Sequence, residues 1–146
     1  MPLSAGTNVA DRGEPQLAAL VVGRPPVGFV WLELVCGQAH VEELAVRMHH
    51  GRRGLGRTLL EAACAWAEAA GYSSITLCTF RDIPWNGPFY RSAGFVELER
   101  GDWCDELVQI RAAERANGLD DLGERVVMVR RLAPAHRGES TTSDGR

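Results

Sequence analysis

A cluster of cations and glycines at residues 47–57 is the part of this sequence best suited to a chemical task. Although the chain has a net charge of −3, six basic side chains fall within these eleven positions: Arg47, His49, His50, Arg52, Arg53 and Arg57. The cluster follows an apolar run at residues 41–46 and precedes an amphipathic helical pattern that begins near Gly54. A helix N-terminus leaves about four N–H groups unpaired and carries roughly half a positive charge, and glycine lets an anion approach the backbone. The junction therefore predicts a phosphate site, with a solvated turn as the alternative for a lone GxG.

The elements expected around this junction form an α/β domain. Apolar and alternating runs predict strands at residues 17–22, 27–35, 39–46, 73–80, 95–98 and 126–132. Helical spacing predicts helices at residues 54–70, 89–93 and 106–116. The second strand is apolar on both faces, which indicates a central strand. The third strand, first helix and fourth strand form a βαβ unit that places the cationic cluster where α/β sheets bind ligands.

Length and composition limit the possible classes of protein. A chain of 146 residues is long enough for one core, which we assign to residues 17–132, between an N-terminal tail at 1–16 and a disordered C-terminal tail at 133–146. No apolar run approaches the ~20 residues of a membrane helix, and the N-terminus lacks targeting patterns, so we expect a cytoplasmic protein. The slightly acidic chain has no extended basic face for nucleic acid. All 16 basic residues are arginines, and the Ala, Arg and Gly excess suggests a GC-rich bacterial genome.

The cysteines give no metal signal. Cys36, Cys64, Cys78 and Cys104 form no CxxC pair and no cluster with histidine suited to zinc. We predict that they are reduced and mostly buried, and that the protein holds no metal.

Three motifs carry a family resemblance, in this order: ELAV followed by GRRGLG and an amphipathic helix, then SSITLCTF, then PWNGPFYRSAGF. Over residues 17–132 the sequence resembles the GNAT superfamily of acetyl-CoA-dependent N-acetyltransferases. The family's phosphate loop usually has Arg or Gln where this chain has Gly51, whereas Gly54 and Gly56 fit. Either Arg52 or Arg53 can supply the missing charge. The Asn86-to-Tyr90 spacing resembles a subgroup with a Pro-Trp-Asn turn.

The resemblance implies a GNAT-like twisted mixed β-sheet, flanked by helices and splayed between the third and fourth strands to admit acetyl-CoA. Pantetheine would pair with the third strand, and the pyrophosphate would lie on N–H groups of residues 53–58. The implied coenzyme-binding residues are Leu44, Ala45, Val46, Arg52, Arg53, Gly54, Leu55, Gly56, Arg57, Thr58, Asn86 and Tyr90. We expect Asn86 to be a turn or cap residue rather than a catalyst.

Acetyl transfer to an amine needs a base, because an alkyl ammonium has a pKa of about 10.4. Strand alternation places His40, Glu42 and Leu44 on one face, and some family members have histidines or a glutamate at positions that resemble His40 and Glu42. The imidazole titrates near neutrality, and burial would raise the pKa of the Glu42 carboxyl. These two are the base candidates, with Glu43 in reserve; ordinary strand polar groups are the alternative.

Tyr90 matches the family's tyrosine acid, which protonates the leaving thiolate; an aromatic that only packs is the alternative. Cys78 lies in an apolar strand without a neighbouring histidine, so we interpret it as a core residue rather than an acyl carrier.

The acceptor is a primary amine that the sequence does not name: a protein N-terminus, a polyamine, an amino sugar and an amino acid all fit. The family usually has a strand and two helices before the hairpin, whereas 16 residues precede Leu17 here. We therefore expect an open acceptor side or one supplied by a second copy, and self-association through the unpaired edge of residues 17–22. The presence of His40, Glu42 and Tyr90 favours an active enzyme over a coenzyme-A-binding module without catalysis. A domain that binds another protein's phosphate is the third reading.

Overall fold

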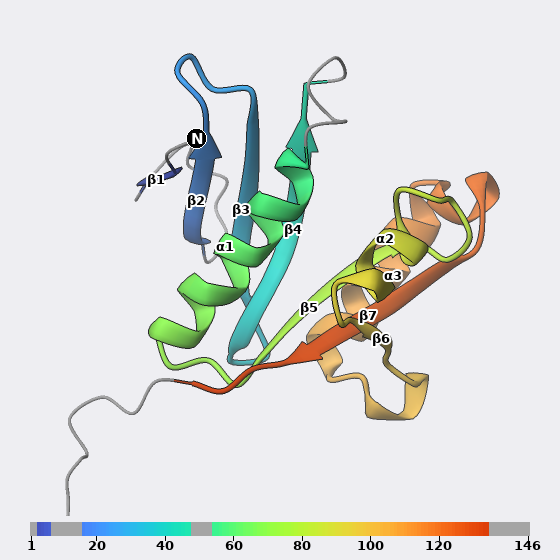
Figure 1. The fold of residues 1–146 in the computed structure, drawn as a ribbon. Coiled ribbons are helices and arrows are strands. Elements are labelled where there is room, and N and C mark those ends of the chain that lie inside the picture. The colour runs from blue at the N-terminus through green and yellow to red at the C-terminus, as the bar shows by residue number, and fades with distance from the viewer. Residues whose placement is uncertain (1–2, 7–15, 48–53, 135–146) are drawn as a thin grey trace, which may run out of the picture.

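The computed structural model describes residues 3–6, 16–47 and 54–134, which form a seven-stranded mixed sheet in the order β1-β2-β3-β4-β5-β7-β6 (Figure 1). The strands are β1 (Leu3–Gly6), β2 (Gln16–Val22), β3 (Gly28–Val35), β4 (Gln38–Val46), β5 (Ser74–Phe80), β6 (Val96–Glu97) and β7 (Arg125–Arg131). The helices are α1 (Leu55–Ala69), α2 (Gly87–Ser92) and α3 (Asp105–Ala116), with 3₁₀ turns η2 (Arg100–Asp102) and η3 (Leu119–Leu122). The predicted α/β class is confirmed, and the predicted elements agree with the observed ones to within two residues at each end.

Strands β4 and β5 part from one another after a short stretch of pairing. They form the parallel pair of the βαβ unit, but only Ala39, His40 and Val41 have partners on β5, namely Ile75, Thr76 and Leu77. Beyond these pairs the two strands diverge (Figure 1). We call this point the fork. It confirms the predicted splay between the third and fourth predicted strands.

A β-bulge lies directly at the fork. On the other side of β4, Leu32 pairs with Val41 but Trp31 pairs with Glu43, so Glu42 is an extra residue in β4. The inserted residue reverses the alternation of the side chains that follow. The residues of β4 that pack in the α1 core are accordingly Ala39 and Val41 before the bulge, and Leu44 and Val46 after it. The prediction that His40, Glu42 and Leu44 share one face is therefore wrong.

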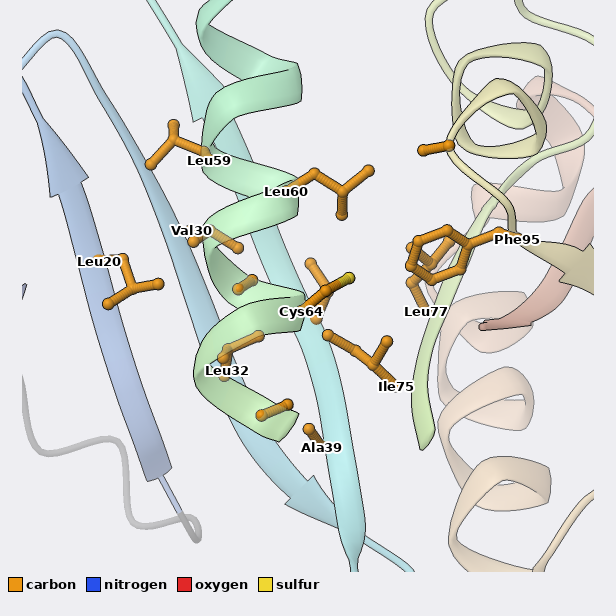
Figure 2. Packing of buried hydrophobic residues seen from close by; sticks show 14 of the residues in the cluster. Leu20, Val30, Leu32, Ala39, Leu59, Leu60, Cys64, Ile75, Leu77 and Phe95 are labelled. Carbon is orange, nitrogen blue, oxygen red and sulfur yellow. The ribbon is translucent and has the colours of Figure 1, made fainter. Parts of the chain in front are cut away.

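The main core lies between α1 and the sheet. The fork divides the sheet into two arms, one made of β1–β4 and the other of β5, β7 and β6. Three residues of α1, Leu59, Leu60 and Cys64, are almost completely buried and point toward residues of both arms, such as Leu32 and Ile75 (Figure 2). Burying one leucine side chain contributes about 1.5–3 kcal/mol. Helix α2 packs on this same face. Helix α3 covers the opposite face of β5 and β7, where Leu107 contacts a smaller cluster with Val35 and Val127.

The N-terminal segment corrects one prediction. Residues 3–6 form β1, which pairs antiparallel with β2 from Leu3 opposite Val22 to Gly6 opposite Ala19. The prediction that residues 1–16 are only a tail is wrong for this strand, and β2 does not have the unpaired edge on which the expected self-association was based. Residues 135–146 of the predicted C-terminal tail lie outside the described residues.

A disulfide corrects a second prediction. Cys36, in the turn between β3 and β4, is bonded to Cys104, the N-cap residue of α3. The Cys36 backbone N–H also donates a hydrogen bond to the Glu106 carboxylate. Cys64 and Cys78 are free thiols, so the expectation of reduced cysteines fails only for the pair that tertiary packing brings together. The bond ties α3 to the arm that contains β3 and β4.

Replacing both bonded cysteines, Cys36→Ser with Cys104→Ser, should lower the free energy of unfolding by about 4 kcal/mol, because the bond joins residues 68 positions apart and restricts the unfolded chain. Urea unfolding with and without reductant measures the effect. Reductant should reduce the stability of the wild type to that of the double variant and leave the double variant unchanged. Equal responses of the two proteins would contradict the prediction.

Candidate active site

The N-terminus of α1 has the geometry of an anion site. Gly54 is left-handed, with φ of 73°, and a Cβ built on it would have nothing within 4 Å. The first N–H bonded within the helix is that of Thr58, which donates to the Gly54 carbonyl over 3.0 Å. The N–H groups of Leu55, Gly56 and Arg57 precede it and are the donors of a helix start. A negative group at this end would also interact favourably with the helix dipole.

Hydrogen bonds within the protein limit what Thr58 and Arg57 can offer to a coenzyme. The Thr58 N–H and hydroxyl both donate to the Gly54 carbonyl, so Thr58 offers no donor to a ligand. The Arg57 guanidinium donates to the Ser92 carbonyl over 3.1 Å and contacts the Glu61 carboxylate, which ties α1 to the end of α2. The Arg57 side chain is therefore already paired within the protein. Arg52 and Arg53, together with His49 and His50, lie outside the described residues.

The β4 edge beyond the fork leads toward this helix. The side chains of Leu44 and Val46 pack against the α1 core, so the backbone is the part of this segment available at the β5 side. Strand pairing with β5 has ended at Val41. An extended ligand with amide groups would add to this edge as a strand does. Leu44, Ala45 and Val46 thus lie on the part of β4 that does not pair with β5.

Tyr90 lies on the α1 face of the sheet, on α2. This helix begins at Gly87, which is buried so tightly that a Cβ would overlap the Arg81 carbonyl. The Tyr90 ring meets Phe89 and Phe95 edge to face, with centroids 5.1 and 5.8 Å away. Burial raises the pKa of the Tyr90 hydroxyl to about 12, so the group remains a proton donor at neutral pH.

Asn86 is the N-cap residue of α2, as predicted for a turn or cap position. Its side-chain oxygen accepts a hydrogen bond from the Thr79 hydroxyl over 2.7 Å, and its carbonyl accepts one from the Tyr90 N–H over 2.9 Å. Asn86 thereby fixes α2, and with it Tyr90, to the end of β5.

On the opposite face, a cavity of about 390 Å³ adjoins the fork beneath α3. We call it the polar cavity, and its ionisable lining residues are Glu33, His40, Glu42, Cys78, Glu114 and Arg125. The structure therefore brings the base candidates His40 and Glu42 together. It places them on the other side of the sheet from Tyr90, so the candidate base and the candidate acid approach the fork from opposite faces.

His40 differs from the expectation in its pKa, and Glu42 differs from it in its burial. His40 is only 2% exposed, and its Nδ1 lies 2.7 Å from the Thr76 hydroxyl. Burial lowers the pKa of the imidazole to about 4, so the expectation that it titrates near neutrality is wrong and the ring is neutral at pH 7. Glu42 is exposed at the bulge, so the burial that was expected for its carboxyl is absent.

Glu43, the reserve candidate, is separated from these two residues. It lines a different cavity of about 510 Å³, largely apolar, with Phe29 and Trp31 on the same side of the sheet. The bulge at Glu42 reverses the alternation, so Glu43 faces away from α1 as His40 does, but it lies further along β4, opposite Trp31 rather than Glu33.

Sequence reasoning missed two carboxylates and misjudged Cys78. Glu33, 8% exposed, is the cross-strand neighbour of His40, and a lone ionisable residue in an apolar strand was a signal for it. Glu114 gave no such signal, because only folding brings α3 to the sheet. Cys78 does share a cavity with His40, contrary to the expectation, but burial raises the pKa of its thiol to about 12. Such a thiol supplies little thiolate for an acyl-enzyme.

A mixed sheet that forks beside a helix N-terminus, with ionisable groups on both sides of the fork, is the arrangement that the resemblance to acetyl-CoA-dependent acyltransferases implied. The family model of the acetyltransferase (GNAT) domain matches residues 16–97, which is more than half of the 146 residues. The chain therefore belongs to the GNAT family of acetyltransferases and is an enzyme that transfers acetyl groups from acetyl-CoA.

Solved structures share this fold. The ribosomal-protein-S18-alanine N-acetyltransferase from Escherichia coli is 21% identical with a TM-score of 0.60, over 92% of this chain and 79% of that one. N-acetylglutamate synthase from Neisseria gonorrhoeae, complexed with coenzyme A and N-acetyl-glutamate, is 17% identical with a TM-score of 0.64, over 94% of this chain and 36% of that one. The PaiA N-acetyltransferase from Thermoplasma acidophilum, in complex with coenzyme A, is 17% identical with a TM-score of 0.56, over 78% and 60%. At these identities the likeness shows the fold alone.

Within residues 3–6, 16–47 and 54–134, no helix is long and apolar enough to cross a membrane. The same part of the chain contains no group of three or more His, Cys, Asp and Glu side chains that could hold a metal ion.

The low pKa of His40 predicts a loss of stability in acid. Between pH 6.5 and about 4 the unfolded chain binds a proton at this position that the folded chain does not, so stability falls as the pH falls. The loss reaches about 3 kcal/mol by pH 4. Urea unfolding of the wild type and His40→Asn at several pH values measures it, and the stability of the wild type relative to the variant should decrease by that amount. Parallel pH profiles would contradict the prediction.

Proposed function

We propose that this enzyme transfers the acetyl group of acetyl-CoA to a primary amine by direct attack of the amine on the thioester. The observation that carries the proposal is the continuity of two backbone features. Strand β4 stops pairing with β5 at the fork, which leaves its backbone edge without a strand partner there. The first N–H groups of α1 then follow along the chain. Together they match a ligand that has amides at one end and a pyrophosphate at the other.

Acetyl-CoA would lie with its pantetheine along Leu44, Ala45 and Val46. Its pyrophosphate would accept hydrogen bonds from the N–H groups of Leu55, Gly56 and Arg57, where the helix dipole favours negative charge. Charge from Arg52 and Arg53 remains a prediction from the sequence. This arrangement directs the thioester toward the fork, between Tyr90 on one face and the polar cavity on the other.

The amine would reach the thioester through the polar cavity. Its nitrogen forms a bond to the carbonyl carbon, the carbon–sulfur bond breaks, and the nitrogen loses a proton to His40 or Glu42, directly or through water. A neutral imidazole can accept that proton, and the nitrogen becomes more acidic once it has attacked. Tyr90 donates its hydroxyl proton to the departing thiolate. The raised pKa of Tyr90 ensures that this proton is present at neutral pH.

A matched pair of substitutions tests the anion site. Asn and Asp both tolerate the left-handed backbone of Gly54 and have nearly the same shape, so they differ mainly in charge. Gly54→Asp should bind coenzyme A at least about tenfold more weakly than Gly54→Asn, because it places a carboxylate beside the pyrophosphate. Calorimetric titration at low salt measures the two affinities, and equal values would place the pyrophosphate elsewhere.

Removal of the Tyr90 hydroxyl tests the acid. Tyr90→Phe keeps the ring packing and should lower kcat by about 10²–10⁴ with little change in affinity for coenzyme A. Tyr72→Phe, at the far end of α1, is the control and should leave kcat unchanged. Because burial raises the pKa of Tyr90 to about 12, the wild type should show no loss of turnover from this group up to about pH 10. Full turnover by Tyr90→Phe would assign the ring a purely structural role.

A further inference from the structure

The candidate base His40 has a polar partner on the neighbouring strand. Its Nδ1 atom lies 2.7 Å from the Thr76 hydroxyl oxygen, at the short end of the usual range for a hydrogen bond. The two residues are cross-strand partners in the parallel pair of β4 and β5, in the second of the three pairs that precede the fork. Both side chains are buried, so water has little access to this bond. The register of the sheet therefore fixes the contact.

The same register decides which nitrogen of the ring remains for a ligand. The neighbours of His40 on β4, Ala39 and Val41, pack in the α1 core, so the imidazole points to the other face of the sheet, where it lines the polar cavity. Its Nδ1 is turned toward Thr76 on β5. Of the two ring nitrogens, Nε2 is thus the one that can meet an amine in the polar cavity.

The hydrogen of the bond between His40 and Thr76 can belong to either group. A neutral imidazole carries one N–H, and a threonine hydroxyl can donate or accept. If the hydroxyl donates to Nδ1, the ring carries its hydrogen on Nε2 and cannot accept a proton from an amine there. If Nδ1–H donates to the hydroxyl oxygen, Nε2 keeps its lone pair and can act as a base. The direction of this one hydrogen bond thus decides whether His40 can perform the proposed role.

The surroundings of Thr76 allow its hydroxyl oxygen to be the acceptor. Thr76 also lines a second cavity, of about 340 Å³, together with the polar residues Gln38, Ser74 and Asp102. The hydroxyl can therefore turn its own hydrogen toward polar groups or water in that cavity while its oxygen accepts from Nδ1. This arrangement satisfies the hydrogens of both groups and leaves the Nε2 lone pair facing the polar cavity.

We infer that Thr76 is a positioning residue, whose hydroxyl oxygen accepts the Nδ1–H of His40 and thereby holds the ring in the tautomer whose Nε2 takes the proton of the acceptor amine. The inference rests on the proposed function and decides between its two candidate bases, His40 and Glu42, in favour of His40. The amine nitrogen gives its proton to Nε2, and the ring becomes an imidazolium with an N–H on each nitrogen. Nε2 then passes that proton to water, and Nδ1 keeps its hydrogen throughout.

The burial of His40 makes this partner important for the reaction. Desolvation lowers the pKa of the imidazole to about 4, so the surroundings disfavour the imidazolium that proton transfer creates. A hydrogen bond from a charged donor is stronger than one from a neutral donor. The Thr76 oxygen therefore stabilises the imidazolium more than the neutral ring, which offsets part of the cost of placing a charge in a buried site.

NMR measures the tautomer without any acceptor. The ¹⁵N shift of an imidazole nitrogen depends strongly on whether it carries hydrogen, and the His40 signals are identified by their absence from His40→Asn. At pH 7 the wild type should carry the hydrogen on Nδ1. Thr76→Val should move it to Nε2, because an N–H at Nδ1 would be buried without its acceptor, whereas Thr76→Ser should keep the wild-type pattern. Hydrogen on Nε2 in the wild type, or an unchanged tautomer in Thr76→Val, would overturn the inference.

Ser74→Ala is the matched control. Ser74 lies two residues before Thr76 on β5, is buried and lines the same second cavity, but its partner across the sheet is Arg131 of β7. Loss of its hydroxyl should leave the His40 shifts and kcat unchanged. A change of tautomer in Ser74→Ala as well would overturn the assignment to Thr76.

Turnover tests the consequence for the reaction. Thiol release from acetyl-CoA is measured with four amines: a peptide with a free N-terminus, putrescine, glucosamine and glycine. With the best of them, Thr76→Val should lower kcat about 10–100-fold, as expected for the loss of a hydrogen bond to a charged group, with unchanged affinity for coenzyme A. Thr76→Ser should recover most of the loss. Full turnover by Thr76→Val would overturn the inference. Absence of thiol release by the wild type with all four amines would count against the proposed function, and the NMR result would then decide the inference by itself.

Discussion

The early end of pairing between β4 and β5 is the constraint on which the structure depends. In a closed sheet every strand satisfies the backbone groups of its neighbours, but here β5 stops satisfying β4 after three residue pairs. An edge with unused donors and acceptors is normally a liability in a folded protein. In this molecule it is the natural place for a ligand that carries its own amides, and the bulge at Glu42 lies where the edge begins. In the proposed function the binding surface is made of backbone, so the side chains of this edge can be ordinary core residues.

The two arms of the sheet need other connections, because so few strand pairs join them. Helix α1 supplies the largest one, since its buried residues contact both arms. Arg130 of β7 adds a second by donating to the Glu61 carboxylate of α1 and to the Ala93 carbonyl after α2, each over 3.1 Å. The disulfide between Cys36 and Cys104 is the third, on the face that α3 covers. These connections join the two arms where strand pairing does not.

Burial favours the uncharged form of both candidate proton-transfer groups, His40 and Tyr90. It lowers the pKa of His40 and raises that of Tyr90, so that each is uncharged at pH 7: one is a base without a proton and the other an acid with one. The charged side chains near the fork are carboxylates and Arg125, whose guanidinium donates to the Glu114 carboxylate.

The sequence by itself determined the order of the elements, the βαβ unit with its glycine-rich junction, and the family, because these depend on local periodicity, on turn residues and on short motifs. It also determined the position of Tyr90, which a six-residue helix fixes a few positions after β5. Only the tertiary structure decided which side chains meet around the fork. Glu42 is the residue inserted at the bulge in β4, and the change of register that it causes is one that no alternation pattern reveals. Glu114 reached the polar cavity, and Cys104 reached Cys36, because α3 folds back onto the sheet from far along the chain. The same folding buried His40 and lowered its pKa, since desolvation depends on which atoms surround a group and not on its neighbours in sequence.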